Sequence, residues 1–238
     1  MRANFLARAR ELGWNPKPGE SDDDRLLRPI LLRAVATDGG APELAKQARD
    51  LAEKWLEDRR AASPEVAGAI LETAAYHGDL ALFNRLLAAY GKDQDRQDRR
   101  RLLTAMRDFR DPAALEAAMQ SVLSGAIALV DGFPLYYAGE EYAETRKLAF
   151  QFIKTHFDQI VSGLPCVFVN DLGALLPQAG APFCDAQSRK ELEDFFGPLV
   201  SQFAGAPRTL AQTLEAIDLC IAGKATREAS VKEFLAKY

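Results

Sequence analysis

The sequence has 238 residues, of which 48% are hydrophobic, and its 30 basic and 34 acidic side chains give a net charge of −4. This composition supports a sizeable core and excludes an intrinsically disordered chain. The balanced charge argues against nucleic acid as a partner, because such a partner requires a basic excess. No apolar run reaches the ~20 residues that span a bilayer, so no membrane span is expected.

Apolar residues recur three or four positions apart along almost the whole chain, and each stripe ends at a break rich in Gly, Pro, Asp or Ser. This spacing is typical of amphipathic α-helices. No window has the period-two alternation and β-branched enrichment of a strand. The expected helices follow the stripes over residues 5–12, 27–35, 44–55, 66–74, 83–90, 102–109, 115–122, 148–157, 192–199, 210–221 and 231–235.

Four prolines stand where a first helical residue is expected, a position at which the missing N–H costs nothing. They are Pro42, Pro64, Pro112 and Pro207. Ser63 and Asp111 precede two of them and are predicted to be N-caps. The starts of these helices are therefore fixed by local signals.

Two further pairs have the spacing of a capping box: Ser188 with Glu191, and Ser21 with Asp24 in place of the usual glutamate. Pro29 lies inside an otherwise helical run. Either the helix is kinked at Pro29, or its regular part begins at Arg28.

These patterns predict an all-α fold. Roughly a dozen short helices joined by tight turns cannot each bury a face alone, so we expect a superhelical stack of antiparallel helix pairs, a HEAT- or armadillo-like α-solenoid. An ordinary globular helical bundle is the alternative that periodicity leaves open. The irregular stretches 131–139 and 163–185 do not shift the composition enough to mark a boundary, so we expect a single domain over residues 1–238.

The chain has two histidines, His77 and His156, and neither lies in the HExxH pattern by which zincin peptidases hold zinc. We therefore expect no metal ligands and no catalytic residues in this chain. His77 is predicted to end a helix and to satisfy terminal carbonyls. His156 is predicted to occupy a polar position beside a core aromatic residue.

The three cysteines, Cys166, Cys184 and Cys220, lie far apart and do not form a CxxC metal ribbon. They are predicted to be small buried apolar residues, although the sequence leaves one disulfide open. The charged run 92–101, with five basic and three acidic residues, is interpreted as a solvated loop and helix start; the alternative is a patch that grips an acidic partner.

The Leu-Gly-Trp run at 12–14 and the Leu-Leu-Arg-Pro run at 26–29 resemble the start of the C-terminal helical domain of the gluzincin zinc aminopeptidases. That family includes aminopeptidase N and the puromycin-sensitive and endoplasmic-reticulum aminopeptidases. Phe150 stands where the family usually has tryptophan. Further similarities follow in the family's order at residues 48–56, 110–112, 148–154, 189–196 and 208–217.

The resemblance implies that the chain is a non-catalytic piece of a larger peptidase, which removes N-terminal residues from peptides. In such enzymes zinc lies on a separate, earlier domain, and the helical domain covers the active-site cavity and gates substrate entry. The implied partners are that catalytic domain of the same polypeptide and peptide substrates. Arg208 is the implied substrate contact, because a guanidinium suits a peptide's terminal carboxylate, whereas an inter-helix salt bridge is its alternative role.

Two other hypotheses compete with this interpretation. One is an independent helical-repeat module that binds another protein. The other, a self-sufficient hydrolase, lacks the necessary ligands. The aminopeptidase hypothesis predicts an exposed apolar docking face, whereas the independent module predicts none. The compartment, the oligomeric state and the preferred N-terminal residue of the substrate stay open.

Overall fold

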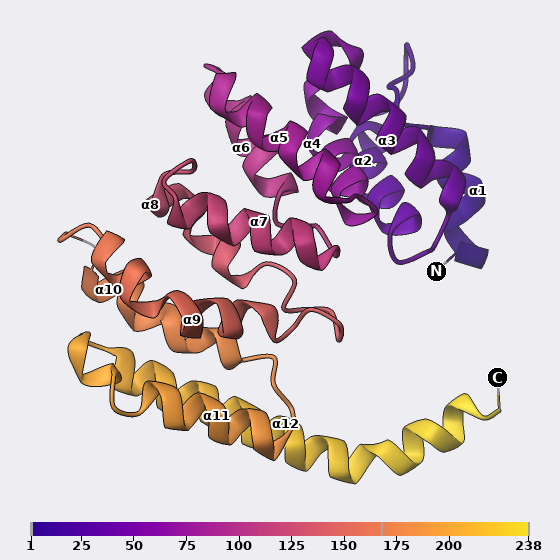
Figure 1. Cartoon of the computed structure of the whole chain (residues 1–238). Helices are drawn as coiled ribbons and strands as arrows, with labels where there is room; N and C mark the ends of the chain where they lie inside the picture. Colours follow the sequence, from indigo (N-terminus) through magenta and orange to yellow (C-terminus); the bar gives the residue numbers. More distant parts are fainter. Residues whose placement is uncertain (1, 168, 238) are drawn as a thin grey trace. The chain divides into compact units, whose positions relative to one another are not determined.

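The computed structural model describes residues 2–167 and 169–237, and within them every regular element is a helix (Figure 1). The predicted all-α class is confirmed. Within the described part of the chain, no helix has both the length and the apolar content needed to cross a membrane.

The chain divides into two compact units, Met1–Ile127 (unit 1) and Ala128–Tyr238 (unit 2). Unit 1 contains α1 (Arg2–Leu12), α2 (Asp22–Ala36), α3 (Pro42–Glu57), η1 (Arg59–Ala61), α4 (Pro64–Tyr76), α5 (Leu80–Lys92), α6 (Arg96–Ala105) and α7 (Pro112–Leu123). Unit 2 contains α8 (Leu129–Gly132), η2 (Phe133–Tyr137), α9 (Leu148–Gly163), α10 (Val169–Leu175), η3 (Leu176–Gly180), α11 (Ala186–Phe196), η4 (Val200–Gln202) and α12 (Ala206–Leu235).

Helix α4 forms the centre of unit 1, where it packs against α2, α3 and α6. Its predicted apolar stripe, Val66, Ile70 and Ala74, is buried. Small alanines fill most of the remaining face, which lets neighbouring helix backbones approach closely. The core of this unit is thus built on the helix whose sequence is most continuously apolar.

The helix starts at Pro42, Pro64 and Pro112 are confirmed, and α12 begins one residue before Pro207. Asp111 caps α7 by accepting a hydrogen bond from the N–H of Ala113 at 3.3 Å. Ser63 holds the N-cap position of α4, but its hydroxyl makes no capping hydrogen bond.

The capping prediction for Ser188 was wrong, because α11 begins at Ala186, three residues before the start that an N-cap at Ser188 implies. Asp185 is the N-cap, and its carboxylate accepts the backbone N–H of Ser188 at 2.8 Å. At α2, the serine half of the predicted capping box is confirmed: Ser21 is the N-cap and accepts the N–H of Asp24 at 3.2 Å. The carboxylate of Asp24 pairs with Arg8 of α1. Helix α2 runs through Pro29 from Asp22, so its regular part does not begin at Arg28.

The Leu-Gly-Trp run forms the turn that ends α1. Gly13 has a φ of +62°, in the left-handed region that favours glycine, and its N–H donates to the carbonyl of Ala9 at 3.0 Å. Trp14 follows, buried, and its indole N–H donates to the carbonyl of Leu44 at 3.2 Å. The motif therefore fixes α1 against the start of α3.

Arg28 holds the same turn from inside α2. Its guanidinium is buried, donates to the carbonyl oxygens of Leu12 and Gly13, and forms an ion pair with Glu20. The arginine of the Leu-Leu-Arg-Pro run is thus a structural residue that satisfies the last carbonyls of α1.

Aromatic side chains form the core of unit 2 around Phe150 of α9. The centroid of the Phe150 ring lies 5.6 Å from that of Phe183, 6.0 Å from that of Phe195 and 6.2 Å from that of Phe196. These distances suit edge-to-face and tilted aromatic packing. The position where the resembling family has tryptophan is therefore a buried aromatic site here too.

A disulfide joins Cys184, in the loop before α11, to Cys220 in α12. The third cysteine, Cys166, is an exposed thiol. The prediction of three small buried cysteines was therefore wrong, and the disulfide that the sequence left open is present. It anchors the middle of α12, beyond which no described residue of this helix is buried.

Candidate functional site

Arg208 lies in the first turn of α12, after Gly205, whose φ of +92° turns the chain into this helix. Its side chain is exposed. Among the described residues no ion pair of the Arg208 guanidinium is found, whereas Arg189 of α11 pairs with Asp218 at 2.6 Å. The geometry therefore leaves the guanidinium of Arg208 open to an anion.

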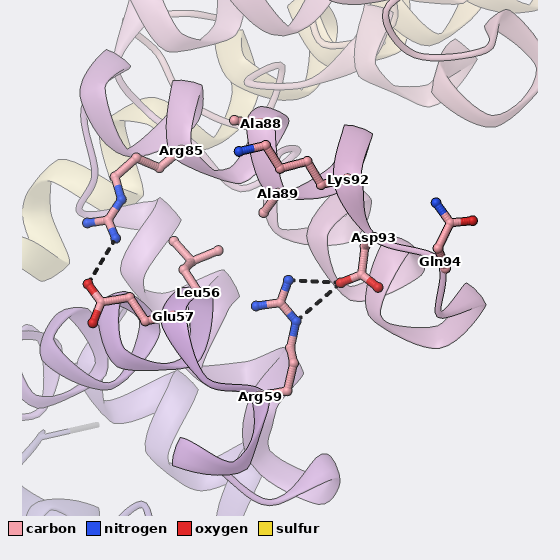
Figure 2. A pocket seen from close by; sticks show the side chains of 9 residues that line it. All are labelled: Leu56, Glu57, Arg59, Arg85, Ala88, Ala89, Lys92, Asp93 and Gln94. Carbon is pink, nitrogen blue, oxygen red and sulfur yellow. Dashed lines mark hydrogen bonds and ion pairs between the residues drawn. The ribbon is translucent and has the colours of Figure 1, made fainter.

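Unit 1 has an open pocket of about 520 Å³ between the end of α3 and α5 (Figure 2). Nine residues line it: Leu56, Glu57, Arg59, Arg85, Ala88, Ala89, Lys92, Asp93 and Gln94. Apolar surface comes from the alanines and Leu56, and charge comes from three cations and two carboxylates. The pocket therefore has both apolar and charged walls.

Arg59 forms one wall of this pocket and is held rigidly. Its guanidinium lies 3.9 Å from the centre of the Trp55 ring and donates to the carbonyl of Trp55 at 2.6 Å. It also forms an ion pair with Asp93 at 2.8 Å. Burial disfavours the charged form of Asp93, but hydrogen bonds from Arg59 and the backbone of Asp95 outweigh this effect and lower its pKa.

Arg85 and Lys92 differ in how their charges are balanced. Arg85 pairs with Glu53 and, at 3.8 Å, with Glu57. Lys92 is exposed, points back toward Ala88 in Figure 2, and has no ion pair among the described residues. Lys92 is thus the pocket cation available to a carboxylate from outside the chain.

The charged run 92–101 forms a loop and the start of α6, as predicted, and several of its side chains make contacts within the chain. Asp95 caps α6 and accepts the N–H groups of Gln97 and Asp98. Arg99 lies 4.2 Å from the centre of the Tyr90 ring, and Arg101 pairs with Asp98 at 2.5 Å. The sequence missed the pocket at Lys92, because only folding brings the end of α3 beside α5.

Both histidines have the structural roles that the sequence predicts. The Nε2 atom of His77, the C-cap residue of α4, lies 2.9 Å from the carbonyl of Ala36, which ends α2. The Nδ1 atom of His156 lies 3.0 Å from Oε1 of Gln159, and the ring centroids of His156 and Phe152 are 4.5 Å apart. Across residues 2–167 and 169–237, no three His, Cys, Asp or Glu side chains gather as metal ligands would.

Buried polar groups at the start of unit 2 were not found by sequence reasoning. Burial raises the pKa of the Glu140 carboxyl to about 8. Burial, and secondarily the charge of Glu140, raises the pKa of the Tyr137 hydroxyl. Oε1 of Glu140 and the hydroxyls of Tyr136 and Tyr137 are buried without a hydrogen-bond partner among the described atoms. The dipeptide Glu140-Glu141 gave no sign of this, because exposed loops carry the same residues.

An apolar stripe on α2 faces outward. Leu26 and Ile30 are 71% and 70% exposed, and Leu27 is 39% exposed. Leu31 and Val35 of the stripe at 27–35 are buried, whereas Leu27 and Ile30, which belong to the same stripe, are exposed. The expected apolar stripe at 231–235 is likewise exposed, because Val231 and Leu235 lie on the projecting part of α12.

Residues 1–219 match the family model described as the ERAP1-like C-terminal domain. The chain is 26% identical over 220 residues to aminopeptidase M1 of Arabidopsis thaliana, which covers 90% of this chain and 24% of that protein. It is 24% identical over 223 residues to aminopeptidase M1-C of Oryza sativa subsp. japonica, which covers 90% of this chain and 24% of that protein.

A fungal protein gives the same result: aminopeptidase 2 of Candida albicans is 24% identical over 213 residues, or 87% of this chain and 22% of that protein. The chain therefore spans about a quarter of the length of these relatives. The family model covers residues of both units. A single match therefore includes both the Leu-Gly-Trp turn of unit 1 and Arg208 of unit 2. The chain belongs to the family of ERAP1-like C-terminal domains found in aminopeptidases.

Proposed function

We propose that the chain is the C-terminal, non-catalytic part of a zinc metalloaminopeptidase that removes N-terminal residues from peptides. The observation that carries this proposal is the family match over residues 1–219. It is supported by relatives that are named aminopeptidases and are about four times as long as the matched segment.

The two histidines of this chain do not fit a zinc site. They lie in different units, and each ring faces an oxygen of the chain, the carbonyl of Ala36 or the amide of Gln159. A zinc peptidase needs two histidines four positions apart on one helix, with a glutamate that activates water. We assign the zinc and the chemical step to a catalytic domain of the same polypeptide, which is the partner of this domain.

The role proposed for this domain is to cover the active-site cavity, to gate entry of the peptide and to contact it. Arg208 is the proposed substrate contact. Its exposure and the lack of an ion pair among the described residues support this role over that of an inter-helix salt bridge. A guanidinium binds a carboxylate through two parallel hydrogen bonds, which suits the terminal carboxylate of a peptide.

The first experiment is an immunoblot of the native source extract with an antibody against this chain. We expect a band far above 26.2 kDa that copurifies with zinc-dependent aminopeptidase activity. A band at 26.2 kDa without that activity would contradict the proposal and would favour the independent helical-repeat interaction module.

The second experiment tests Arg208 in the active enzyme. The variant Arg208→Ala should raise KM severalfold for peptides with a free C-terminal carboxylate and leave kcat and the KM of amidated peptides unchanged. Arg227→Ala is the matched control, because Arg227 is another exposed arginine of α12. Equal effects on free and amidated peptides would exclude a carboxylate contact.

A further inference from the structure

Helix α2 has two apolar faces, and only one of them is used within the chain. Its inner face packs against α1, α3 and α4 and buries Leu31, Leu32 and Val35. Its outer face carries Leu26, Leu27 and Ile30, which we call the α2 stripe. Leu26 and Ile30 are one helical turn apart, so their side chains lie on the same face.

The α2 stripe differs from the single exposed apolar residues that every protein has. Leu26 and Ile30 expose 71% and 70% of their surface on adjacent turns, and Leu27 lies between them. Asp22 and Asp23 stand one turn before Leu26 and are also exposed. Asp22 pairs with Arg25 of the same helix at 3.6 Å, whereas Asp23 has no ion pair among the described residues. Such a cluster, bordered by charge, is typical of an interaction surface.

We propose that the α2 stripe docks against another part of the same, longer polypeptide, on an apolar surface that carries a basic group opposite Asp23. This inference rests on the proposed function. The length of the relatives supports the choice of occupant, because the chain accounts for only 24% of aminopeptidase M1 and its rice relative M1-C. Three quarters of such a polypeptide is available to cover the stripe.

The size of the stripe favours an intramolecular contact over a dimer. Its three side chains expose on the order of 300 Å² of apolar surface, well below the ~800 Å² that each partner of a stable complex buries. A covalent link between the two parts raises their effective concentration, so a small contact suffices.

Charge also argues against a second copy of this chain as the occupant. In a two-fold symmetric pairing of two α2 helices, Asp23 of one copy would face the end of α2 that carries Arg33 in the other. Arg33 is already engaged with Glu72 at 3.0 Å and Asp108 at 3.1 Å. Asp23 would therefore find no available cation there.

Hydroxyl-radical footprinting of side chains tests the proposal. The isolated 238-residue chain and the native long polypeptide are oxidised under the same conditions, and modification is read at Leu26, Ile30 and Leu219. Leu219 is the internal control, because it is 67% exposed and lies on α12. We expect oxidation of Leu26 and Ile30 to fall severalfold in the long polypeptide relative to Leu219.

Each other result overturns the inference. Equal oxidation of the stripe in an active long aminopeptidase would exclude docking at α2 and leave the proposed function intact. Protection in the isolated chain that grows with its concentration, together with a dimer by light scattering, would identify a second copy as the occupant. A native protein of 26.2 kDa with an unprotected stripe would contradict both proposals.

A pair of variants locates the contact. Leu26→Ser combined with Ile30→Ser should leave the circular dichroism of the isolated chain unchanged, because both side chains are exposed. In the long polypeptide it should increase oxidation of Leu27, whereas Leu219→Ser should not. If the double variant leaves oxidation of Leu27 unchanged, the stripe is not the docking surface.

Discussion

Arg28 and Glu20 form an ion pair whose side chains are only 1% and 8% exposed. The pair closes the turn between α1 and α2, where Arg28 also donates to two carbonyl oxygens. A buried ion pair contributes little net stability, but removing one partner leaves the other charge buried and uncompensated. The pair therefore makes the turn sensitive to single substitutions.

We expect Glu20→Gln to lower the free energy of unfolding by about 3 kcal/mol, because the Arg28 guanidinium stays buried without a counter-charge. Urea denaturation followed by circular dichroism measures the change. Glu11→Gln is the control, since the Glu11 side chain is 66% exposed and pairs with Arg8 on the surface. Similar effects of the two variants would show that the Arg28–Glu20 pair is not buried in solution.

Gly13→Ala should destabilise the fold by roughly 1–2 kcal/mol, because an L-residue at φ +62° is strained. No neighbouring atom lies where the added methyl group would stand, so the change in stability reports the backbone strain alone. Gly91→Ala is the matched control, since Gly91 lies inside α5 and is equally unobstructed. There alanine should raise stability by roughly 0.5–1 kcal/mol. If Gly13→Ala leaves the free energy of unfolding unchanged, residue 13 does not adopt the left-handed conformation.

Breaking the Cys184–Cys220 disulfide should lower stability by roughly 2–4 kcal/mol, because it closes a loop of 36 residues in the unfolded chain. Thermal unfolding with and without a dithiol reductant measures this, and Cys166→Ser serves as the control. A thiol assay on the denatured, unreduced chain should detect one cysteine, Cys166. Detection of three thiols there would contradict the disulfide.

The raised pKa of Glu140 predicts that stability depends on pH. The folded state holds the proton up to about pH 8, whereas the unfolded carboxyl loses it near its ordinary value of 4.5. The stabilising contribution of the bound proton is complete below pH 4.5, falls between pH 4.5 and 8, and is lost above pH 8. Glu140→Gln should remove this slope and stabilise the protein most at pH 8 and above. Glu141→Gln, at the exposed neighbour, is the control for the substitution itself.

The sequence predicted what depends on local chemistry. Proline positions gave three helix starts to the residue, and the periodicity of Val66, Ile70 and Ala74 identified the buried face of α4. The caps were predicted less well: Asp185 and Ser188 both have side chains that suit an N-cap, and the structure places Asp185 at that position.

The remaining features depend on which segments meet in space. Ile30 has the spacing of a core residue, but periodicity does not say whether a second surface covers it. Cys184 and Cys220 carry no distance information in the sequence. The pocket around Lys92 likewise exists only because the end of α3 lies beside α5. Arg208 was singled out by its position in a family-like motif, and the structure adds the exposure of its side chain.

The Cys184–Cys220 disulfide also limits how much of α12 proteolysis can release. Lys224 and Arg227 lie in the exposed part of α12, immediately after the cross-linked cysteine. Trypsin can therefore cleave after Lys224 and Arg227 and release the end of this helix, whereas the packed portion stays joined through Cys220 to the loop before α11. Limited proteolysis is therefore expected to remove the segment after Cys220 and to leave the packed part of the chain intact. That part ends close to residue 219, where the family match ends.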